Sequence, residues 1–115
     1  MSKRGNIEWL SDIKEAIRRI SLYIEKMSYE EFLEDIKTQD AIVRNLEIIG
    51  ESAKNISGDF EKKYRQLPWK DLAKVRDKLI HHYFGVNYDI VWEIAKEEIP
   101  KIILQVEEIL NKEGE

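Results

Sequence analysis

Apolar residues along this chain recur at intervals of three and four, the spacing that places side chains on one face of an α-helix. One apolar stripe covers residues 6–27, and a second starts at residues 38–40 and ends at Ser57-Gly58, where glycine suits a left-handed helix cap. Between them, Ser28 and Glu31 form a capping-box pattern that predicts a short helix reaching about Ile36. No segment alternates with a period of two, so the pattern predicts an all-α, antiparallel bundle of four to five helices.

The second half of the chain continues this pattern with two further stripes. One starts at residues 67–69, where Pro68 is tolerated in a first helical turn, and the residues 59–66 before it form a short helical or irregular connector. The other follows a cap at Asn87 or Asp89, and Pro100 should kink or break it because proline lacks an amide donor. We expect residues 1–115 to form a single helical domain with a tail that frays from about residue 112.

Gly50 lies inside the second stripe, at a cost of about 1 kcal/mol relative to alanine. A glycine at such a position predicts that a neighbouring element approaches the helix closely. Glu51 follows it directly, and its carboxylate is either solvated or part of a site.

Composition narrows the location of the protein and the class of site. The chain has no cysteine, which excludes disulfides and thiolate metal sites and favours a reducing compartment. No apolar run approaches the length of about 18 residues that a membrane span needs, and the N-terminal stretch lacks the apolar core of a signal peptide. We therefore expect a soluble, untargeted, cytoplasmic protein with no membrane partner.

The net charge of −4 disfavours nucleic acid as a partner, because Lys and Arg supply most of the affinity for phosphate. The charge is unevenly distributed, since residues 62–83 hold seven basic side chains against two acidic ones, a local +5 that leaves −9 elsewhere. Such a window is either an RNA-binding surface or an ordinary charged helix face. The basic residues are Lys62, Lys63, Arg65, Arg76 and the three that we take as RNA-binding candidates, Lys70, Lys74 and Lys78.

Chemically reactive side chains gather in residues 76–83, which read Arg-Asp-Lys-Leu-Ile-His-His-Tyr. A guanidinium, an imidazole that titrates near neutrality and a phenol hydroxyl are together typical of a site for phosphodiesters. On a regular helix Asp77 and His81 lie about 40° apart, so the carboxylate can fix the imidazole tautomer, whereas Arg76 and His81 diverge by about 140°. Either the helix loosens near His81 or a second copy of the chain completes the site. The alternative is a solvated helix face with two histidines at its end.

No metal or cofactor site is expected from the sequence. His81 and His82 are adjacent, and on a helix they would point about 100° apart, which makes them a poor pair of metal ligands. The chain also lacks a His-Glu-x-x-His sequence, an acidic calcium loop and a glycine-rich nucleotide loop.

With Arg76, His81 and Tyr83 spaced as Arg-x4-His-x-Tyr, the chain resembles the HepT toxins of the HEPN superfamily. These are small helical proteins encoded beside a minimal nucleotidyltransferase antitoxin of the MntA type. The resemblance spans nearly the whole chain and includes four further blocks: Tyr-Glu-Glu-Phe at 29–32, Asp-Ala-x-x-Arg-Asn-Leu-Glu-Ile-Ile-Gly-Glu at 40–51, Leu-Pro-Trp at 67–69 and Val-Trp-Glu-Ile at 91–94.

The resemblance implies a homodimeric, metal-independent endoribonuclease without a cofactor, in which two copies of the motif line one cleft at the dimer interface. His81 matches the catalytic histidine and Arg76 the motif arginine, and Asp77 fits a position that is often polar and supports them. Tyr83 matches the tyrosine to which the partner nucleotidyltransferase transfers AMP, which neutralises the toxin. The substrate would be RNA and not DNA, because the mechanism uses the 2′-hydroxyl. Gly50 and Glu51 match a family signature with no role assigned.

Two other functions remain open from the sequence. The first is a non-catalytic helical dimer that docks the nucleotidyltransferase or presents its substrate, with the basic window serving the partner or a bound nucleotide. The second is a structural bundle without a site.

Overall fold

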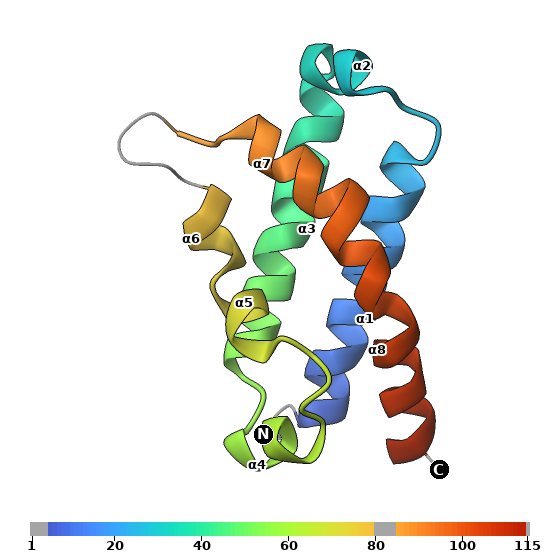
Figure 1. The fold of residues 1–115 in the computed structure, drawn as a ribbon, viewed down its shortest axis with the longest axis vertical. Coiled ribbons are helices and arrows are strands. Elements are labelled where there is room, and N and C mark those ends of the chain that lie inside the picture. Colours follow the sequence, from blue (N-terminus) through green and yellow to red (C-terminus); the bar gives the residue numbers. More distant parts are fainter. Residues whose placement is uncertain (1–4, 80–84, 115) are drawn as a thin grey trace.

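Residues 5–79 and 85–114 are described by a computed structural model, in which they form helices and no strand (Figure 1). The predicted all-α class is confirmed for this part of the chain. It is divided into more helices than the four to five expected, because two predicted helices are interrupted and one predicted connector is itself helical. No helix among the described residues is long and apolar enough to cross a bilayer.

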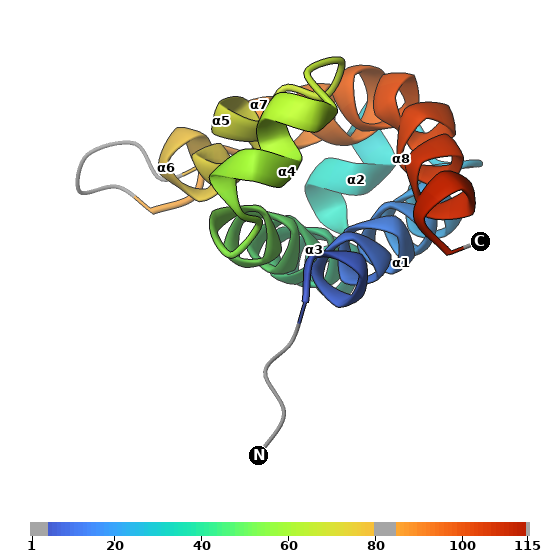
Figure 2. The same cartoon turned by 90° about the horizontal axis from the view of Figure 1, so that it is seen from below.

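The bundle is built around α1 (Asn6–Ile24), which packs against α3 (Ile36–Lys54) and α8 (Ile99–Glu113). α1 runs antiparallel to both of these neighbours (Figures 1 and 2), which confirms the predicted packing of the long helices. The apolar stripe predicted for α1 forms the centre of these contacts. Its almost fully buried members are Leu10, Ile13, Ile17, Ile20 and Ile24.

The corner between α1 and α3 contains the short helix α2 (Tyr29–Glu34). Its capping box is confirmed: the Ser28 hydroxyl accepts a hydrogen bond from the Glu31 amide at 3.1 Å, and the Glu31 carboxylate accepts one from the Ser28 amide at 2.9 Å. Asp35 then ends α2 and caps α3, because its carboxylate accepts from the Thr38 amide at 3.0 Å. The predicted start of this long helix at residues 38–40 is therefore wrong, and α3 begins at Ile36.

Gly58 is not the left-handed cap that the sequence predicted, since α3 already ends at Lys54. Gly58 is instead the first residue of α4 (Gly58–Lys63). This helix begins there because the Ser57 hydroxyl accepts a hydrogen bond from the Phe60 amide at 3.3 Å. The predicted connector at residues 59–66 is thus helical over its first half.

The helix predicted from residues 67–69 onward is divided at Lys74 into α5 (Trp69–Ala73) and α6 (Val75–Leu79). Pro68 occupies the N-cap position of α5. Both short helices pack against α3 (Figure 1). The apolar stripe predicted from residues 67–69 onward is buried at Trp69, Leu72, Val75 and Leu79, and Ile80, which the same spacing would place on this face, lies outside the described residues.

The last helical run consists of α7 (Tyr88–Glu93), the π-helical turn η1 (Ile94–Glu98) and α8. Asn87, one of the two predicted caps, begins α7 because its side-chain oxygen accepts hydrogen bonds from the amides two and three residues further on. The α-helical pattern is interrupted directly before Pro100, where the Ile99 amide bonds to a carbonyl five residues back. The predicted break at this proline is confirmed, and it takes the form of a π-helical turn.

The C-terminal end of α8 is helical through Glu113, and the fraying predicted from about residue 112 stays a prediction. The Glu113 carboxylate accepts a hydrogen bond from Lys63 Nζ at 2.8 Å and another from the Tyr64 hydroxyl. These contacts join the last turn of α8 to the end of α4. Lys63 and Tyr64 precede Glu113 by 50 and 49 residues in the sequence, so no local pattern could indicate the contacts.

Candidate functional site

The helix α6 carries Arg76 and Asp77 from the predicted motif, and both side chains are exposed. His81, His82 and Tyr83 lie outside the described residues. The pairing of Asp77 with His81 and the divergence of Arg76 from His81 therefore stay predictions.

One short hydrogen bond joins the chain before these three residues to the chain after them. The Asn87 amide donates to the Leu79 carbonyl at 2.7 Å, which links the end of α6 to the start of α7. Leu79 is almost fully buried, and Val86 packs against the core. The residues that flank the predicted catalytic segment are thus fixed on the bundle.

The position of α6 on the bundle depends on Gly50 of α3. A Cβ atom added to Gly50 would lie 3.3 Å from Val75 Cγ1, and 3.6 and 3.7 Å from the carbonyl oxygens of Leu72 and Ala73. The close approach predicted from this glycine is confirmed, and the approaching element is the junction between α5 and α6. Because Arg76 directly follows Val75, this contact also fixes the base of the Arg76 side chain.

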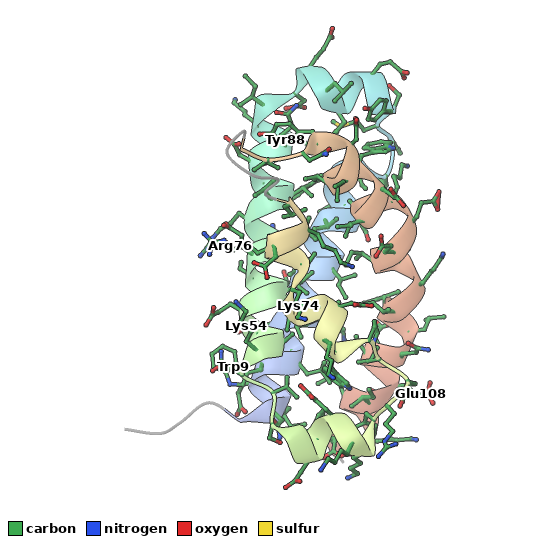
Figure 3. The ribbon with its side chains drawn as sticks, turned by 60° about the vertical axis from the view of Figure 1, so that its left-hand side comes forward. Trp9, Lys54, Lys74, Arg76, Tyr88 and Glu108 are labelled. Atoms are coloured by element: carbon green, nitrogen blue, oxygen red, sulfur yellow. The ribbon has the colours of Figure 1, made fainter. Side chains whose placement is uncertain are left out.

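Arg76 reaches back toward α3 and contacts a carboxylate there. Its Nε atom lies 3.6 Å from Glu47 Oε2, and the two side chains are 59% and 36% exposed. Figure 3 shows Arg76 projecting from the edge of the molecule. A guanidinium in this position is open to a large anionic ligand such as a nucleic acid.

The basic window predicted from the sequence is divided between different surfaces. Lys70, Lys74 and Lys78 are all exposed, but Lys78 lines a small cavity of about 60 Å³ between α5–α6 and the η1–α8 run, together with Asp71 and Glu98. Arg76, by contrast, faces α3. The structure therefore brings Lys78 to a different side of α6 from Arg76.

The other basic residues of the window, Lys62, Lys63 and Arg65, lie in α4 or just after it, and Lys63 has an acidic partner. Lys63 is bound to Glu113, whose carboxylate raises the pKa of Lys63 through a hydrogen bond. Lys62, Arg65 and Lys70 line a shallow hollow of about 530 Å³ beside Trp69. The local charge of +5 is thus not concentrated at Arg76.

Glu47 is the residue that the sequence interpretation missed. It belongs to the block at residues 40–51 and precedes Gly50 by three positions, which places both on the same face of α3. That spacing was the available signal. Glu51 is less informative, because the structure pairs it with its own helix, where Asn55 Nδ2 donates to the Glu51 carbonyl at 2.9 Å and to its carboxylate at 3.3 Å.

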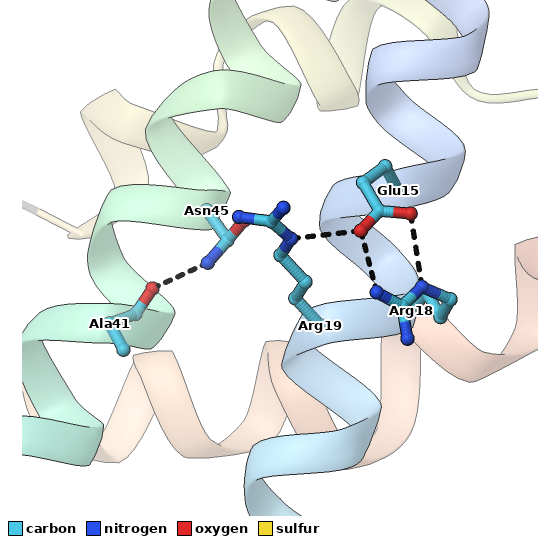
Figure 4. A network of polar contacts seen from close by, with 5 residues as sticks. All are labelled: Glu15, Arg18, Arg19, Ala41 and Asn45. Carbon is cyan, nitrogen blue, oxygen red and sulfur yellow. Dashed lines mark hydrogen bonds and ion pairs between the residues drawn. The ribbon is translucent and has the colours of Figure 1, made fainter.

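A second polar cluster lies on α1, where Glu15 binds two arginines (Figure 4). The Glu15 carboxylate accepts hydrogen bonds from Arg18 at 2.7 and 3.0 Å and from Arg19 at 2.9 Å. These hydrogen bonds, that from Arg18 foremost, lower the pKa of the Glu15 carboxyl from its ordinary value of 4.5 to about 2. Asn45 of the neighbouring α3 donates to the Ala41 carbonyl at 2.8 Å.

Among residues 5–79 and 85–114, no three His, Cys, Asp or Glu side chains are grouped so that they could hold a metal ion.

A sequence model of the protein family described as Ribonuclease HepT-like matches residues 13–109. The chain belongs to this HepT-like family. The match includes residues 76–83, so the Arg-x4-His-x-Tyr series of this HepT-like chain lies within the family domain.

Curated relatives cover most of the HepT-like chain. It is 48% identical over 116 residues to "Putative RNase MJ0127" of Methanocaldococcus jannaschii, an alignment that covers all of this chain and 96% of the relative. It is 47% identical over 100 residues to "Probable ribonuclease HepT" of Thermococcus cleftensis, with 87% and 91% covered. It is 51% identical over 90 residues to "Putative RNase TTE0752" of Caldanaerobacter subterraneus subsp. tengcongensis, with 78% and 80% covered. No solved structure matches.

Proposed function

We propose that this HepT-like protein is an endoribonuclease that cleaves RNA without a metal ion, with Arg76 and His81 as its catalytic residues and Asp77 in support. The observation that carries the proposal is the exposed Arg76 guanidinium on a helix fixed against α3, five residues before His81. Further support comes from relatives that are named as ribonucleases and that align with almost the whole chain.

The reaction needs a base, an acid and positive charge. A base removes the proton of the ribose 2′-hydroxyl, the 2′-oxygen attacks phosphorus, and the bond to the 5′-oxygen breaks as an acid protonates that leaving group. His81 from one or both subunits serves as base or acid. Arg76 stabilises the negative charge that develops on the phosphoryl oxygens, where an arginine fork fits phosphate geometry.

Incubation of the purified protein with total RNA in excess chelator tests this activity. We expect cleavage of RNA and none of a DNA strand of the same sequence, because DNA lacks the attacking 2′-hydroxyl. Intact RNA after incubation with the pure protein, under conditions where it still binds the nucleotidyltransferase, would favour the docking module instead.

We further propose that the active species is a homodimer in which both copies of the motif face one cleft. The support is geometric, because Arg76 and His81 diverge by about 140° on a regular helix and a second copy can supply the missing group. Mixing Arg76→Ala subunits with His81→Ala subunits should restore cleavage that neither variant shows alone. Unrestored cleavage in a verified mixed dimer, or RNA cleavage by a monomer in sedimentation, would contradict the shared site.

The regulatory part of the proposal is a toxin–antitoxin pair in which a nucleotidyltransferase of the MntA type transfers AMP to Tyr83. A phenol is a poor base at neutral pH but an adequate acceptor for a nucleotidyl group. The attached phosphodiester anion and adenosine would occupy the positive charge at Arg76 and block RNA.

Tyr83→Phe tests that switch. The variant should keep its fold and at least part of its activity and should escape neutralisation by the nucleotidyltransferase with ATP. Intact-mass and peptide mapping should place AMP on residue 83 of the wild type. Adducts on Tyr64 or Tyr88, or none in an active pair, would remove Tyr83 from this role.

A further inference from the structure

The contact between Arg76 and Glu47 is closest at the Nε edge of the guanidinium. The recorded approach is from Arg76 Nε to Glu47 Oε2, at 3.6 Å. An arginine has five N–H donors in a planar fork, and a contact at Nε leaves the terminal amino groups available to a second acceptor. Glu47 and a phosphate can therefore bind the same guanidinium from different edges.

This ion pair is too exposed to be important for stability. Pairs between exposed charged side chains contribute about 0–1 kcal/mol and are screened by salt. Its consequence for Arg76 is a matter of direction. A free arginine side chain populates many rotamers and loses about 2 kcal/mol of conformational entropy when it is fixed. A carboxylate at 3.6 Å favours those rotamers that reach toward it. If Arg76 is already ordered before the substrate arrives, less conformational entropy is lost when the substrate binds.

The two partners are held at this spacing by rigid packing. Gly50, one turn after Glu47 on α3, allows Val75 to approach within van der Waals contact, and Arg76 is the next residue after Val75. Val75 is buried, and its β-branched side chain has few rotamers, so its packing on Gly50 holds in place the residue directly before Arg76. The carboxylate and the guanidinium thus extend from two backbones whose separation is fixed.

We propose that Glu47 is a positioning residue, which holds the Arg76 guanidinium by Nε so that its terminal amino groups face the scissile phosphate of RNA. The inference rests on the proposed ribonuclease function. The alternative role predicts the opposite effect on the rate. A carboxylate that merely competes with RNA for Arg76 would slow the reaction, and its removal would speed it.

The kinetic test compares Glu47→Gln with Glu51→Gln. Both substitutions remove one negative charge from α3, but Glu51 is bonded to Asn55, the C-cap of that helix, so only Glu47→Gln releases Arg76. We expect Glu47→Gln to lower kcat by about 10- to 100-fold, the usual effect of a misplaced catalytic group. Glu51→Gln should cleave like the wild type, and Glu47→Asp, which has the charge but a shorter reach, should be intermediate.

Two kinetic outcomes would overturn the inference. One is equal activity of Glu47→Gln and Glu51→Gln, and the other is faster cleavage by Glu47→Gln. A further check is non-additivity: in an Arg76→Ala background, Glu47→Gln should lower kcat no further, since its target is gone.

An NMR experiment detects the Arg76–Glu47 contact in the absence of RNA, so it tests this inference separately from the proposed function. The Nε–Hε signal of Arg76 in a ¹H–¹⁵N NMR spectrum, assigned by its loss in Arg76→Ala, should shift in Glu47→Gln and stay in place in Glu51→Gln. An unmoved signal in Glu47→Gln overturns the positioning role even if the enzyme is active. If the signal shifts in Glu47→Gln as expected but the wild type leaves RNA intact, the ribonuclease function is refuted, and with it the role in cleavage, while the Arg76–Glu47 contact stands.

Discussion

Replacing Gly50 by leucine should destabilise the protein and displace the helix that carries Arg76. The site has no room for a side chain larger than a methyl group, since a Cβ alone would lie 3.3 Å from Val75 Cγ1 and 3.6 and 3.7 Å from the carbonyl oxygens of Leu72 and Ala73. Val75 is only 4% exposed and cannot move aside into solvent. The additional carbons of leucine must therefore push the α5–α6 junction away from α3.

The expected magnitude follows from two opposing effects. Leucine in place of glycine inside a helix gains nearly 1 kcal/mol of helix propensity. Overpacking a well-filled site costs about 1–3 kcal/mol, and a site that is tight even for a Cβ belongs at the upper end of that range. We therefore expect Gly50→Leu to lower the free energy of unfolding by about 2 kcal/mol, and Gly50→Ala to change it by less than about 1 kcal/mol.

Chemical denaturation measures these differences, with Gly58→Leu as the matched control. Gly58 also lies in a helix, but nothing lies within 4 Å of a Cβ added there, so the control should be as stable as the wild type or slightly more stable. Gly50→Leu should also lose RNA cleavage under conditions where it remains folded. Equal stability of the two leucine variants would refute the close packing of α3 against the α5–α6 junction.

Two further predictions concern contacts away from Arg76. The Glu15 pKa is lowered to about 2, so its contribution to stability should be present above its ordinary value of 4.5 and lost as the pH falls toward 2. The melting-temperature gap between wild type and Glu15→Gln should thus close over that range and shrink in high salt, and a gap that is constant with pH would contradict it. Tyr64→Phe removes one of the two donors to Glu113, so amide hydrogen exchange should accelerate in the last turn of α8 but not in α3. Unchanged exchange there would show that Lys63 alone holds this end.

Features that depend on neighbouring residues in the sequence were predictable. Ser28 and Glu31 cap α2 with reciprocal hydrogen bonds three residues apart, and Asn87 caps α7 in the same local way. Gly50 predicted the close approach of another element, because a glycine inside a helix is less favourable than alanine and needs a packing reason. The sequence could not say which element approaches, since Val75 is 25 residues away.

Features that depend on distant contacts were missed or misplaced. No glycine or proline lies inside residues 69–79, so nothing local predicts the division of the helix at Lys74. The division lies beside the carbonyls of Leu72 and Ala73, which pack on Gly50 of α3. Glu47 was overlooked as a partner of Arg76 for the same reason, although its spacing from Gly50 was visible.

The measurement that tests the central claim most directly is the comparison of His81→Ala with His82→Ala in RNA cleavage, with chelator present and helicity checked by circular dichroism. A positioned general acid or base contributes about 10²–10⁴ to the rate, so His81→Ala should lose activity by that factor while its helicity is unchanged. His82→Ala should lose much less. Equal losses would mean that the catalytic imidazole is misassigned, and full activity in His81→Ala would contradict the mechanism.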